Sequence, residues 1–473
     1  MHMYIDGEWV SSPKVTEIRN PYSGEVVDTV PEATEEQVDQ AVGAALQGAS
    51  AMGRLTAYER SRVLLRAADL IEERVDKFAR TITAEEGKPL VESRGEAARV
   101  PDLLRLSAHE GAQLRGETLP LDAEAGGRGK FGFTVRIPCG VVAAITPFNY
   151  PFLLVAHKVG PALAAGNAVV LKPASATPLT ALAFTEVLIE AGLPAQGIQC
   201  LTGPGGTVGP TLVSDRRVRK VSFTGSRDVG AHIAQLAGAK RLTLELGANC
   251  PLVVMPDADL EAAATATARG GYVNAGQVCI SIQRVIVDRR VYADFLDALV
   301  PAVEQIRVGD PFEEGTRLSA MVSEGEAARV FSWIEEAVSG GARLLTGGDR
   351  VGAVLSPAVV AEAGPRMRIS RDELFGPAVA VTAATTLDEA IAMANDSEYG
   401  LGAGIFTRDL QAALRFAFQT GTGMVMINES PLWRADLMPY GGLKGSGIGR
   451  EGPRYAIEEM TEIRTIVFHG LEA

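Results

Sequence analysis

Residues 141–172 read VVAAITPFNYPFLLVAHKVGPALAAGNAVVLK, and this stretch decides the fold class. The apolar runs at 141–146 and 168–172 have the length of buried strands, and residues 153–165 between them have the spacing of a helix. Two parallel strands need a crossover of this kind, which is usually a helix. The stretch therefore predicts one βαβ unit of a parallel sheet.

The same alternation continues along the chain. Further helices are predicted at 178–191, 207–214 and 228–238, and further strands at 197–202 and 220–223. A second α/β rhythm runs from Leu252 to about Ile427, with strands at 284–288, 378–382 and 424–427. Four helices precede both, at 35–46, 57–74, 77–86 and 93–111. The pattern predicts an α/β protein with parallel sheets covered by helices on both faces.

Length and composition bound the class of protein. A chain of 473 residues exceeds the size at which one hydrophobic core stops growing, so two or more domains are expected. With 47% hydrophobic and 22% charged residues, the chain is typical of a globular protein. Its net charge of −13 makes nucleic acids and anionic membranes poor partners.

The cysteines indicate a reducing compartment. The 4 cysteines are widely spaced, and together with the 5 histidines they show no metal-site spacing, so we expect free thiols, no metal and a cytoplasmic protein. Asp6 and Glu8 come before any apolar run, which argues against a signal peptide. Residues 137–157 carry no charge, but Pro138, Pro147 and Pro151 would break a membrane helix, so a buried strand, a turn and a helix start are expected there.

Two residues have the chemistry to oxidise an aldehyde through a covalent thioester. Cys279 ends Gly276-Gln277-Val278-Cys279, and Glu245 begins Glu245-Leu246-Gly247. A thiolate can attack a carbonyl carbon, and a carboxylate can activate the water that releases the acid. Each residue also has an ordinary interpretation. The cysteine would be a small buried hydrophobic residue, and the carboxylate would end a strand in a salt bridge.

Further motifs accompany these two residues in order. They are TPFNYP (146–151), GNAVVLKPAS (166–175), SFTGS (222–226), ELFGP (373–377) and MPYGGLKGSG (438–447). In this set the chain resembles the NAD(P)-dependent aldehyde dehydrogenase superfamily over essentially its whole length. Its motif style is similar to that of lactaldehyde and succinate-semialdehyde dehydrogenases. The resemblance implies a parallel-sheet cofactor-binding domain, an α/β catalytic domain and a small β oligomerisation arm.

The resemblance also implies how the chain is divided. Residues 1–115 and 138–246 would form the NAD(P)-binding domain, 247–445 the catalytic domain, and 116–137 with 446–473 the arm. We expect the strand-like residues 131–137 to pair with 462–468. In the family such an arm adds strands to a neighbouring subunit's sheet, which would make a homodimer or homotetramer. A peripheral hairpin is the alternative, and the sequence leaves both open.

The expected cofactor is NAD or NADP. The glycine fingerprint G-x-G-x-x-G is absent, because the last glycine of the stretch 203–209 comes one position late. The resemblance instead implies Gly209, Gly225 and Ser226 at helix starts, and Lys172 on the adenosine ribose. Ser175 stands where many NAD-preferring relatives carry Glu, so NADP is expected to be accepted. The other implied cofactor residues are Thr146, Pro147, Val229, Leu246, Glu373 and Phe375.

For catalysis, the resemblance assigns Cys279 as nucleophile, Glu245 as base, and the Asn149 side chain with the Cys279 N–H as oxyanion donors. A related branch that transfers the acyl group to coenzyme A typically lacks this Glu, so hydrolysis is favoured. Two rival interpretations belong to other classes. A cysteine hydrolase would use His157 as base, and a non-enzymatic binding protein would keep the fold with a decayed site.

The substrate is expected to be a small oxygenated or anionic aldehyde, such as lactaldehyde, glycolaldehyde or succinic semialdehyde. Arg105 and Arg434 are candidate ligands for a substrate anion, since an arginine binds carboxylate or phosphonate groups in pairs of hydrogen bonds. Surface or interdomain salt bridges are the alternative for each of them. Arg284, five residues after Cys279, is expected to anchor a strand.

The assignment of Glu245 generates a kinetic prediction. An amide cannot take the proton of the attacking water, so Glu245→Gln should form the thioester and then stall. We expect one burst of NAD(P)H, measured by near-ultraviolet absorbance, followed by turnover reduced about 10²–10⁴-fold. Unchanged steady-state turnover would point to another base or to a coenzyme A acceptor.

Overall fold

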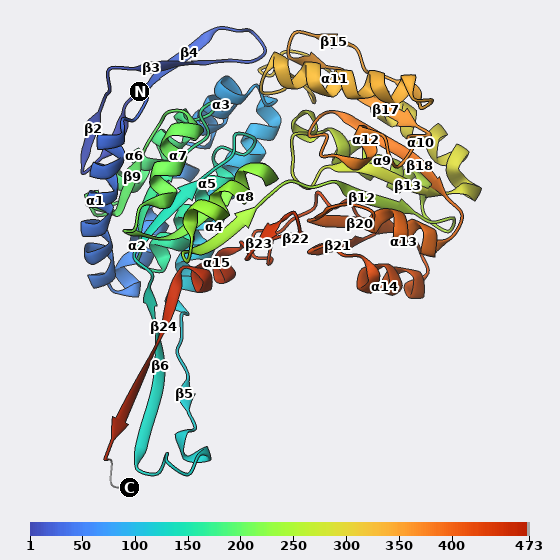
Figure 1. The fold of residues 1–473 in the computed structure, drawn as a ribbon. Coiled ribbons are helices and arrows are strands. Elements are labelled where there is room, and N and C mark those ends of the chain that lie inside the picture. Colours follow the sequence, from blue (N-terminus) through green and yellow to red (C-terminus); the bar gives the residue numbers. More distant parts are fainter. Residues whose placement is uncertain (471–473) are drawn as a thin grey trace.

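The computed structural model describes residues 1–470 and consists of two α/β lobes and a long β arm (Figure 1). The first lobe contains an 8-stranded sheet in the order β2-β1-β9-β8-β7-β10-β11-β23. Strands β9, β8, β7, β10 and β11 are parallel. At the two ends of this parallel set, β1 pairs antiparallel with β9, and β23 pairs antiparallel with β11. The strand bounds are β1 Met3–Ile5, β2 Glu8–Val10, β7 Val141–Ile145, β8 Ala168–Lys172, β9 Ile198–Cys200, β10 Val218–Thr224, β11 Arg241–Glu245 and β23 Gly447–Ile448.

Helices cover both faces of this sheet. The strands are apolar on both sides, and successive residues of β7 enter different cores: Val142 and Ala144 pack with α2, α4, α5 and α6, while Val141 and Ala143 pack with α1, α7 and α8. Thr34 and Thr56 start α1 and α2 with capping boxes. The helix bounds are α1 Glu35–Arg54, α2 Ala57–Glu72, α3 Val75–Glu86, α4 Leu90–Ala112, α5 Leu153–Ala164, α6 Leu179–Glu190, α7 Gly205–Ser214, α8 Arg227–Ala237 and α15 Pro453–Glu459.

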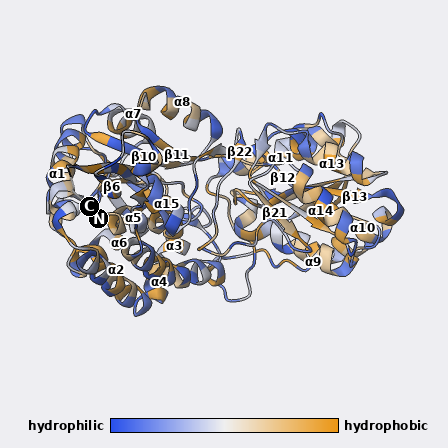
Figure 2. Cartoon of the chain, turned by 90° about the horizontal axis from the view of Figure 1, so that it is seen from below, coloured by the Kyte–Doolittle hydropathy of each residue, from blue (hydrophilic) through white to orange (hydrophobic). Residues whose placement is uncertain are grey.

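The second lobe is built on a 7-stranded sheet in the order β14-β17-β18-β13-β12-β20-β21. All its pairs are parallel except β14 with β17. Its strands are β12 Cys250–Val254, β13 Ile282–Asp288, β14 Arg343–Thr346, β17 Ala358–Ala361, β18 Ala378–Ala384, β20 Gly402–Phe406 and β21 Met424–Ile427. Its helices are α9 Leu260–Tyr272, α10 Tyr292–Glu304, α11 Glu324–Ser339, α12 Arg368–Arg371, α13 Leu387–Asn395 and α14 Leu410–Gln419. Seen from below, the outer helices of both lobes carry hydrophilic and hydrophobic bands, as two-faced helices do (Figure 2).

The arm is a 3-stranded sheet that projects from the first lobe (Figure 1). β24 (Thr461–His469) pairs antiparallel with β6 (Lys130–Pro138) over nine residues, which confirms the pairing expected of 131–137 and 462–468, and β5 (Thr118–Leu119) adds a short edge. Phe131, Ile463 and Phe468 are exposed on it. Residues 446–460 were expected in the arm, but they pack on the first lobe. β23 pairs with β11, and α15 packs on α4 and α5 because Ile457 and Met460 enter the first core.

The elements that the sequence pattern predicted are present, most with ends that differ by a few residues, although α1 continues to Arg54 instead of ending at 46. β11 and most elements of the second lobe were not predicted individually. The N-terminal strands are a departure, since residues 1–31 were not predicted to contain strands. Here β1 joins the first sheet through β9, and β3 (Val15–Arg19) pairs with β4 (Val26–Pro31). Two further short pairs are β15 (Arg350–Val351) with β16 (Val354–Leu355), and β19 (Tyr399–Gly400) with β22 (Leu443–Lys444). The 3-10 helices are Leu121–Ala123, Ala195–Gly197, Val273–Gly276 and Arg289–Val291.

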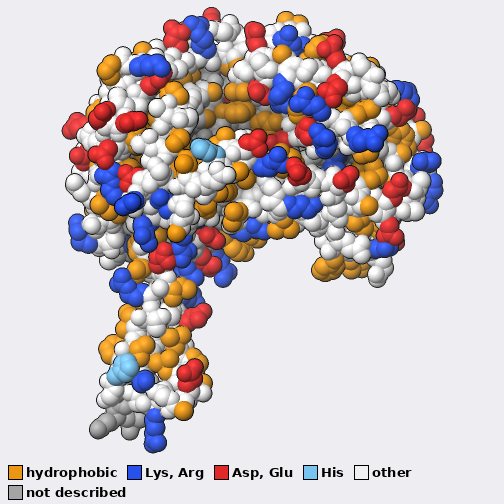
Figure 3. Space-filling view, viewed as in Figure 1, with side chains coloured by type: hydrophobic (Ala, Val, Ile, Leu, Met, Phe, Trp, Pro, Cys, Tyr) orange, Lys and Arg blue, Asp and Glu red, His pale blue; other side chains and the backbone are white. Residues whose placement is uncertain are grey.

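A hollow lies between the two lobes (Figure 3). Apolar atoms are visible inside it, and charged side chains surround it. Across residues 1–470, no helix combines the length and the apolar character needed to span a bilayer. We expect the predicted site to lie in this hollow.

Candidate active site

The parallel sheet of the first lobe brings several predicted residues to one edge. Thr146 and Asn149 follow β7, Lys172 ends β8, Thr224 ends β10 and Glu245 ends β11. The carboxyl ends of parallel strands lie on the same side of a sheet, which is where α/β proteins bind ligands. The first lobe therefore supplies the residues predicted to act as base and as one oxyanion donor, together with several of the predicted cofactor residues.

Cys279 comes from the second lobe on an unusual turn. After α9, Asn274, Ala275 and Gly276 have φ values of 51°, 53° and 71°, three left-handed residues in succession. Such conformations are costly for residues other than glycine and gather at functional sites. Gly276 has no alternative, because a Cβ there would lie 2.1 Å from the Gly376 carbonyl oxygen. The turn sets the direction of the backbone that leads to Cys279.

The thiol of Cys279 contacts a tyrosine that carries an arginine on its face. Cys279 Sγ lies 2.8 Å from Tyr440 Oη, and the Arg434 guanidinium lies 3.8 Å from the centroid of the Tyr440 ring. Burial raises the pKa of Cys279 to about 11, although the Tyr440 hydroxyl and the Arg434 charge both act to lower it. The resting thiol is therefore protonated at neutral pH and needs a base or a further positive charge to react.

The two predicted oxyanion donors come from different lobes, Asn149 from the first and the Cys279 N–H from the second. Asn149 Nδ2 donates to Gln277 O at 2.7 Å, and Asn149 is almost fully buried. This bond uses one of the two amide hydrogens and leaves the other for a ligand. Within residues 1–470, the backbone N–H of Cys279 has no hydrogen-bond acceptor. Two donors are thus available beside the thiol.

Glu245 is a buried carboxylate closely approached by the backbone of Gly441. In the described part of the chain neither of its oxygens has a hydrogen-bond partner. Burial, reinforced by the negative charge of Glu451, raises the pKa of Glu245 well above its usual range. Gly441 lies close by, and a Cβ there would be 2.9 Å from Glu245 Oε1. A carboxylate with a raised pKa is a better base near neutral pH than an ordinary one.

Two charged groups next to these residues were not predicted from the sequence. Lys158 Nζ donates to Glu451 Oε1 at 2.7 Å, and both side chains are buried. The backbones of Glu451 and Tyr440 bond to each other in both directions, which holds Tyr440 near Glu245. Tyr440 belongs to the motif 438–447, but a tyrosine between Pro and Gly gives no sign of its contact with Cys279, 161 residues away.

His157 belongs to a separate chain of contacts. Its Nε2 lies 3.1 Å from Asp436 Oδ1, so it has the acidic partner that the sequence did not reveal. Burial, together with the Arg434 charge, lowers the pKa of His157 to about 4. Its ring also faces Arg434, at 3.2 Å from Nη2, whereas the contact made by the Cys279 thiol is with Tyr440. This geometry does not support a cysteine hydrolase with His157 as base.

The residues predicted to hold NAD or NADP fit a nucleotide. Thr146 Oγ1 and Thr224 Oγ1 are buried without a partner in residues 1–470, at the ends of neighbouring strands. Ser226 is the N-cap of α8, but its hydroxyl makes no cap bond. Gly209 lies in the second turn of α7 and not at its start as expected, with open space where a Cβ would be. Gly225 could accept no Cβ because Phe223 fills the position. Free donors at helix starts and unfilled space are what phosphate and ribose groups need.

Lys172 and Ser175 lie together at the end of β8. Lys172 Nζ donates to Pro173 O at 2.7 Å and lies 3.5 Å from Ser175 Oγ, which itself donates to Gly203 O. Burial lowers the pKa of Lys172 to about 8. Val229, in the first turn of α8, is half exposed, and Leu246 packs under Gly230. Pro147, the last of the predicted cofactor residues, follows Thr146 in the same loop and is partly buried.

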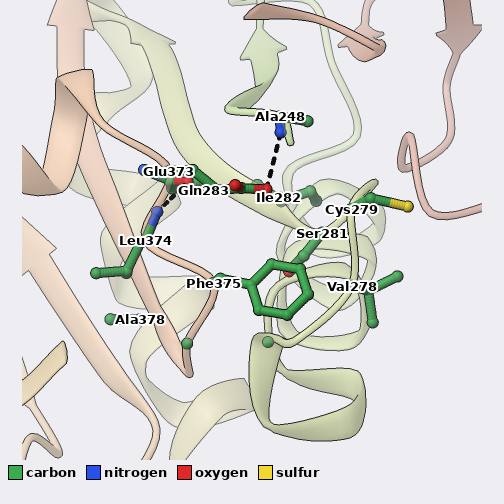
Figure 4. A pocket seen from close by; sticks show the side chains of 12 residues that line it. Ala248, Val278, Cys279, Ser281, Ile282, Gln283, Glu373, Leu374, Phe375 and Ala378 are labelled. Carbon is green, nitrogen blue, oxygen red and sulfur yellow. Dashed lines mark hydrogen bonds between the residues drawn. The ribbon is translucent and has the colours of Figure 1, made fainter. Parts of the chain in front are cut away.

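A small cavity is lined by Cys279, Glu373 and Phe375 (Figure 4). Glu373 accepts from Ala248 N at 2.9 Å, and Gly247 lets it approach, because a Cβ there would lie 2.2 Å from Glu373 Oε2. Burial raises the pKa of Glu373 to about 7. Phe375 points into the cavity, while the sulfur of Cys279 is turned away from it (Figure 4). The two sides of the thiol are therefore distinct, with this cavity on one and Tyr440 on the other.

The two candidate arginines have different surroundings. Arg434 lies in the site, through its contact with Tyr440. Arg105 does not: its guanidinium is paired with Asp69, Glu72 and Asp102 on the exposed faces of α2 and α4, which is the salt-bridge alternative. Arg284 is buried and donates to the carbonyls of Asn249, Met393 and Ala394, so it anchors β13 as expected. Within residues 1–470 no group of acidic, histidine or cysteine side chains could hold a metal ion.

Comparison with known proteins gives a consistent picture. A family model described as "Aldehyde dehydrogenase family" matches residues 9–466. The chain is 44% identical to 3-sulfolactaldehyde dehydrogenase of Priestia aryabhattai, covering 99% of this chain and 98% of that protein. It is 40% identical to lactaldehyde dehydrogenase of Methanococcus vannielii, covering 99% and 100%. The structure of NADP-dependent glyceraldehyde-3-phosphate dehydrogenase from Bacillus halodurans, complexed with NADP, superposes with a TM-score of 0.97 at 35% identity, covering 99% of both chains.

The contact between Cys279 and Tyr440 generates a pH prediction. The Tyr440 hydroxyl lowers the pKa of Cys279, so Tyr440→Phe should raise that pKa. Alkylation by iodoacetamide follows the thiolate fraction, so its rate rises with pH up to the pKa and the variant's profile should move to higher pH. We expect alkylation at pH 8 to slow by about threefold to tenfold, of the order of one hydrogen bond. Tyr455→Phe, on α15, is the matched control, and superimposable profiles for wild type and Tyr440→Phe would contradict the assignment.

Proposed function

The chain belongs to the aldehyde dehydrogenase family, and we propose that it oxidises a short 2-hydroxy aldehyde with an anionic group on its third carbon. The proposed cofactor is NAD or NADP. The observation that carries the substrate class is the state of Arg434, a cation at the catalytic cysteine without a carboxylate partner. The catalytic roles proposed for Cys279, Glu245 and Asn149 follow from the geometry around the thiol.

The proposed reaction begins at Cys279. The thiolate adds to the aldehyde carbon, and the carbonyl oxygen becomes an oxyanion that accepts from Asn149 Nδ2 and the Cys279 N–H. The nicotinamide, when bound, accepts the hydride that leaves this thiohemiacetal. Glu245 then removes a proton from water, which attacks the resulting thioester, and the acid leaves as the thiolate is restored. The raised pKa of Glu245 supports its role as base. The presence of Glu at this position favours hydrolysis over transfer to coenzyme A.

The anion would be bound by Arg434. In the described chain Arg434 forms no ion pair, its Nε is buried without a partner, and its Nη2 faces His157, whose lowered pKa keeps the ring neutral. A partly buried guanidinium with unused donors is a site for a carboxylate, sulfonate or phosphate. Lactaldehyde, 3-sulfolactaldehyde and glyceraldehyde 3-phosphate, for which the three proteins above are named, share a 2-hydroxypropanal backbone. Two of them carry the anion on the third carbon, where Arg434 would bind it.

A substrate panel tests the role of Arg434. We expect Arg434→Met to reduce kcat/KM for 3-sulfolactaldehyde about 10–10²-fold more than for lactaldehyde, because a hydrogen bond to a charged group contributes about 1.5–3 kcal/mol. The ratio of the two substrates is the measured quantity, since losing the Arg434 charge also raises the pKa of Cys279 and slows both.

Arg105→Met is the matched control, because its guanidinium lies in surface ion pairs, and it should leave the ratio unchanged. Succinic semialdehyde should follow 3-sulfolactaldehyde, and glycolaldehyde should follow lactaldehyde. Equal losses on charged and uncharged aldehydes in Arg434→Met, or fastest oxidation of decanal by the wild type, would refute the proposed substrate class.

The cofactor preference is proposed to be weak. Ser175 puts a neutral hydroxyl beside the Lys172 ammonium where a carboxylate would repel a 2′-phosphate. The Ser175 hydroxyl is engaged by Gly203 O, so it leaves the Lys172 charge uncompensated. Both NAD and NADP are therefore expected to bind.

Comparing kcat/KM for the two cofactors tests this. The wild type should use NADP at rates comparable to NAD, and Ser175→Glu should move the ratio towards NAD by about tenfold or more, the effect of one like charge at close range. Ser175→Gln has a similar size without the charge and should move it far less. A wild-type preference for NAD above about a hundredfold, roughly 2.7 kcal/mol, would refute the idea.

The domain division and assembly are also proposals. We propose residues 1–115 and 138–246 as the cofactor-binding domain, with 446–460 added because they pack on it, and 247–445 as the catalytic domain. The arm, reduced to 116–137 and 461–470, is proposed to pair with a second copy, since its edge strand β24 exposes Ile463 and Phe468 beside Phe131 of the central strand β6. A cytoplasmic homodimer or homotetramer fits these features and the four free thiols.

A further inference from the structure

A buried lysine lies behind the oxyanion donor Asn149. Lys88, in the connection between α3 and α4, is 1% exposed. Its Nζ donates to Asn149 O at 2.6 Å and to Glu96 Oε2 at 2.6 Å, and it lies 4.0 Å from the centroid of the Tyr150 ring. The reaction proposed above makes no use of this group. It touches neither Cys279 nor the cavity beside it.

The second lobe supplies a matching contact. Asn274 Nδ2 donates to Asn149 O at 3.1 Å and to Glu86 Oε1 at 2.7 Å. Asn274 is the first left-handed residue of the turn that carries Cys279. The carbonyl of Asn149 therefore accepts from one donor of each lobe, while its side chain reaches across to Gln277 O. The backbone of Asn149 is fixed from both sides of the site.

The carboxylates of this cluster are also in use. Glu96 Oε1 accepts from the backbone N–H groups of Phe152 and Leu153, at the start of α5, while its other oxygen binds Lys88. Glu92 Oε2 accepts from Asn274 N at 2.8 Å. Burial raises the pKa of Glu86 well above its usual range and that of Glu92 to about 7. Burial lowers the pKa of Lys88, but Glu86 and Glu96 outweigh it and the net direction is upward.

Fold stability alone does not explain such a cluster. Replacing a buried ion pair by apolar residues of similar volume is often neutral or stabilising. What the apolar replacement would lose is direction, because a charged donor at 2.6 Å fixes where the Asn149 carbonyl points. An oxyanion donor is effective only when it is already aimed at the place where charge develops.

We propose that Lys88 and Asn274 are positioning residues that hold Asn149 in the orientation required for aldehyde addition. They act through the carbonyl of Asn149 and do not touch the substrate. The inference rests on the proposed role of Asn149 as oxyanion donor. It predicts that losing Lys88 slows the formation of the thiohemiacetal and leaves the thiol and the cofactor site intact.

The test uses the burst of NAD(P)H with lactaldehyde, which lacks the anionic group that Arg434 is proposed to bind. Lys88→Met alone leaves both Glu86 and Glu96 without their cation. Glu86 can take up a proton, because burial raises its pKa, so the single variant is compared with Lys88→Met/Glu96→Gln, in which the new amide oxygen can still accept from Phe152 and Leu153. We expect the double variant to regain thermal stability while its burst rate constant stays about 10–10²-fold below wild type, approaching the effect of losing an oxyanion donor. Recovery of both the thermal stability and the burst rate constant in the double variant would show a structural role only and would overturn the proposal.

Two further readouts separate positioning from general damage. Alkylation of Cys279 by iodoacetamide forms no oxyanion, and NAD(P) binding does not involve Asn149, so both should stay within about twofold of wild type. Adding Asn149→Ala to the double variant should cause no loss beyond that of Asn149→Ala alone, because residues that act through one group are not additive. A parallel fall in alkylation and cofactor binding, or losses that multiply with Asn149→Ala, would refute it.

Asn274→Gly provides an independent variant that is expected to fold, since glycine adopts φ 51° without strain. It removes the second donor to Asn149 O and should slow the burst about threefold to tenfold, the effect of one neutral hydrogen bond. This loss should also vanish in the Asn149→Ala background. A wild-type burst rate in Asn274→Gly would contradict the role of Asn274.

Discussion

The hydrogen bond from Asn149 Nδ2 to Gln277 O joins the two halves of the active site, and the rest of the site depends on it. It connects the loop after β7 in the first lobe with the turn before Cys279 in the second. Buried polar groups must be paired, so a bond of this kind holds both segments in one register. Glu245, Lys172 and the unpartnered threonines are placed by the strand ends of the first sheet. Backbone pairing with Glu451 holds Tyr440, whose ring lies against Arg434.

The electrostatics around this bond favour neutral forms at rest. Burial raises the pKa of both Cys279 and Glu245, and the charge of Glu245 raises that of Cys279 further. A negative charge on Glu245 therefore makes the Cys279 thiol harder to ionise, whereas the Arg434 charge lowers the pKa of both groups. When the positive nicotinamide ring is bound, a further charge of the same sign is added near the thiol. Binding of the cofactor would thus favour the thiolate at the moment when it can be used.

The fold was predictable from the sequence wherever periodicity was strong. The apolar runs of β7 and β8 and the helix between them were predicted to within a residue, because a strand buried on both faces leaves a continuous apolar run. The strands at 1–31 were not predicted because they are short and because β1 joins the sheet through pairing with residues near 200, which no local pattern marks. The catalytic and cofactor residues were found through family motifs rather than through periodicity. Tyr440, Lys88 and Asp436 were not, because their roles arise from contacts across more than 60 residues, and nothing local in the sequence marks such a contact.

The burial of the Cys279 thiol has a consequence for the lifetime of the protein. Peroxides and disulfides react with thiolates, and the oxidation of a cysteine beyond the sulfenic acid is irreversible. A thiol with a pKa near 11 exposes very little thiolate to such oxidants while no substrate is present. The same desolvation that makes the nucleophile dependent on a bound partner therefore protects it from chemical damage between turnovers.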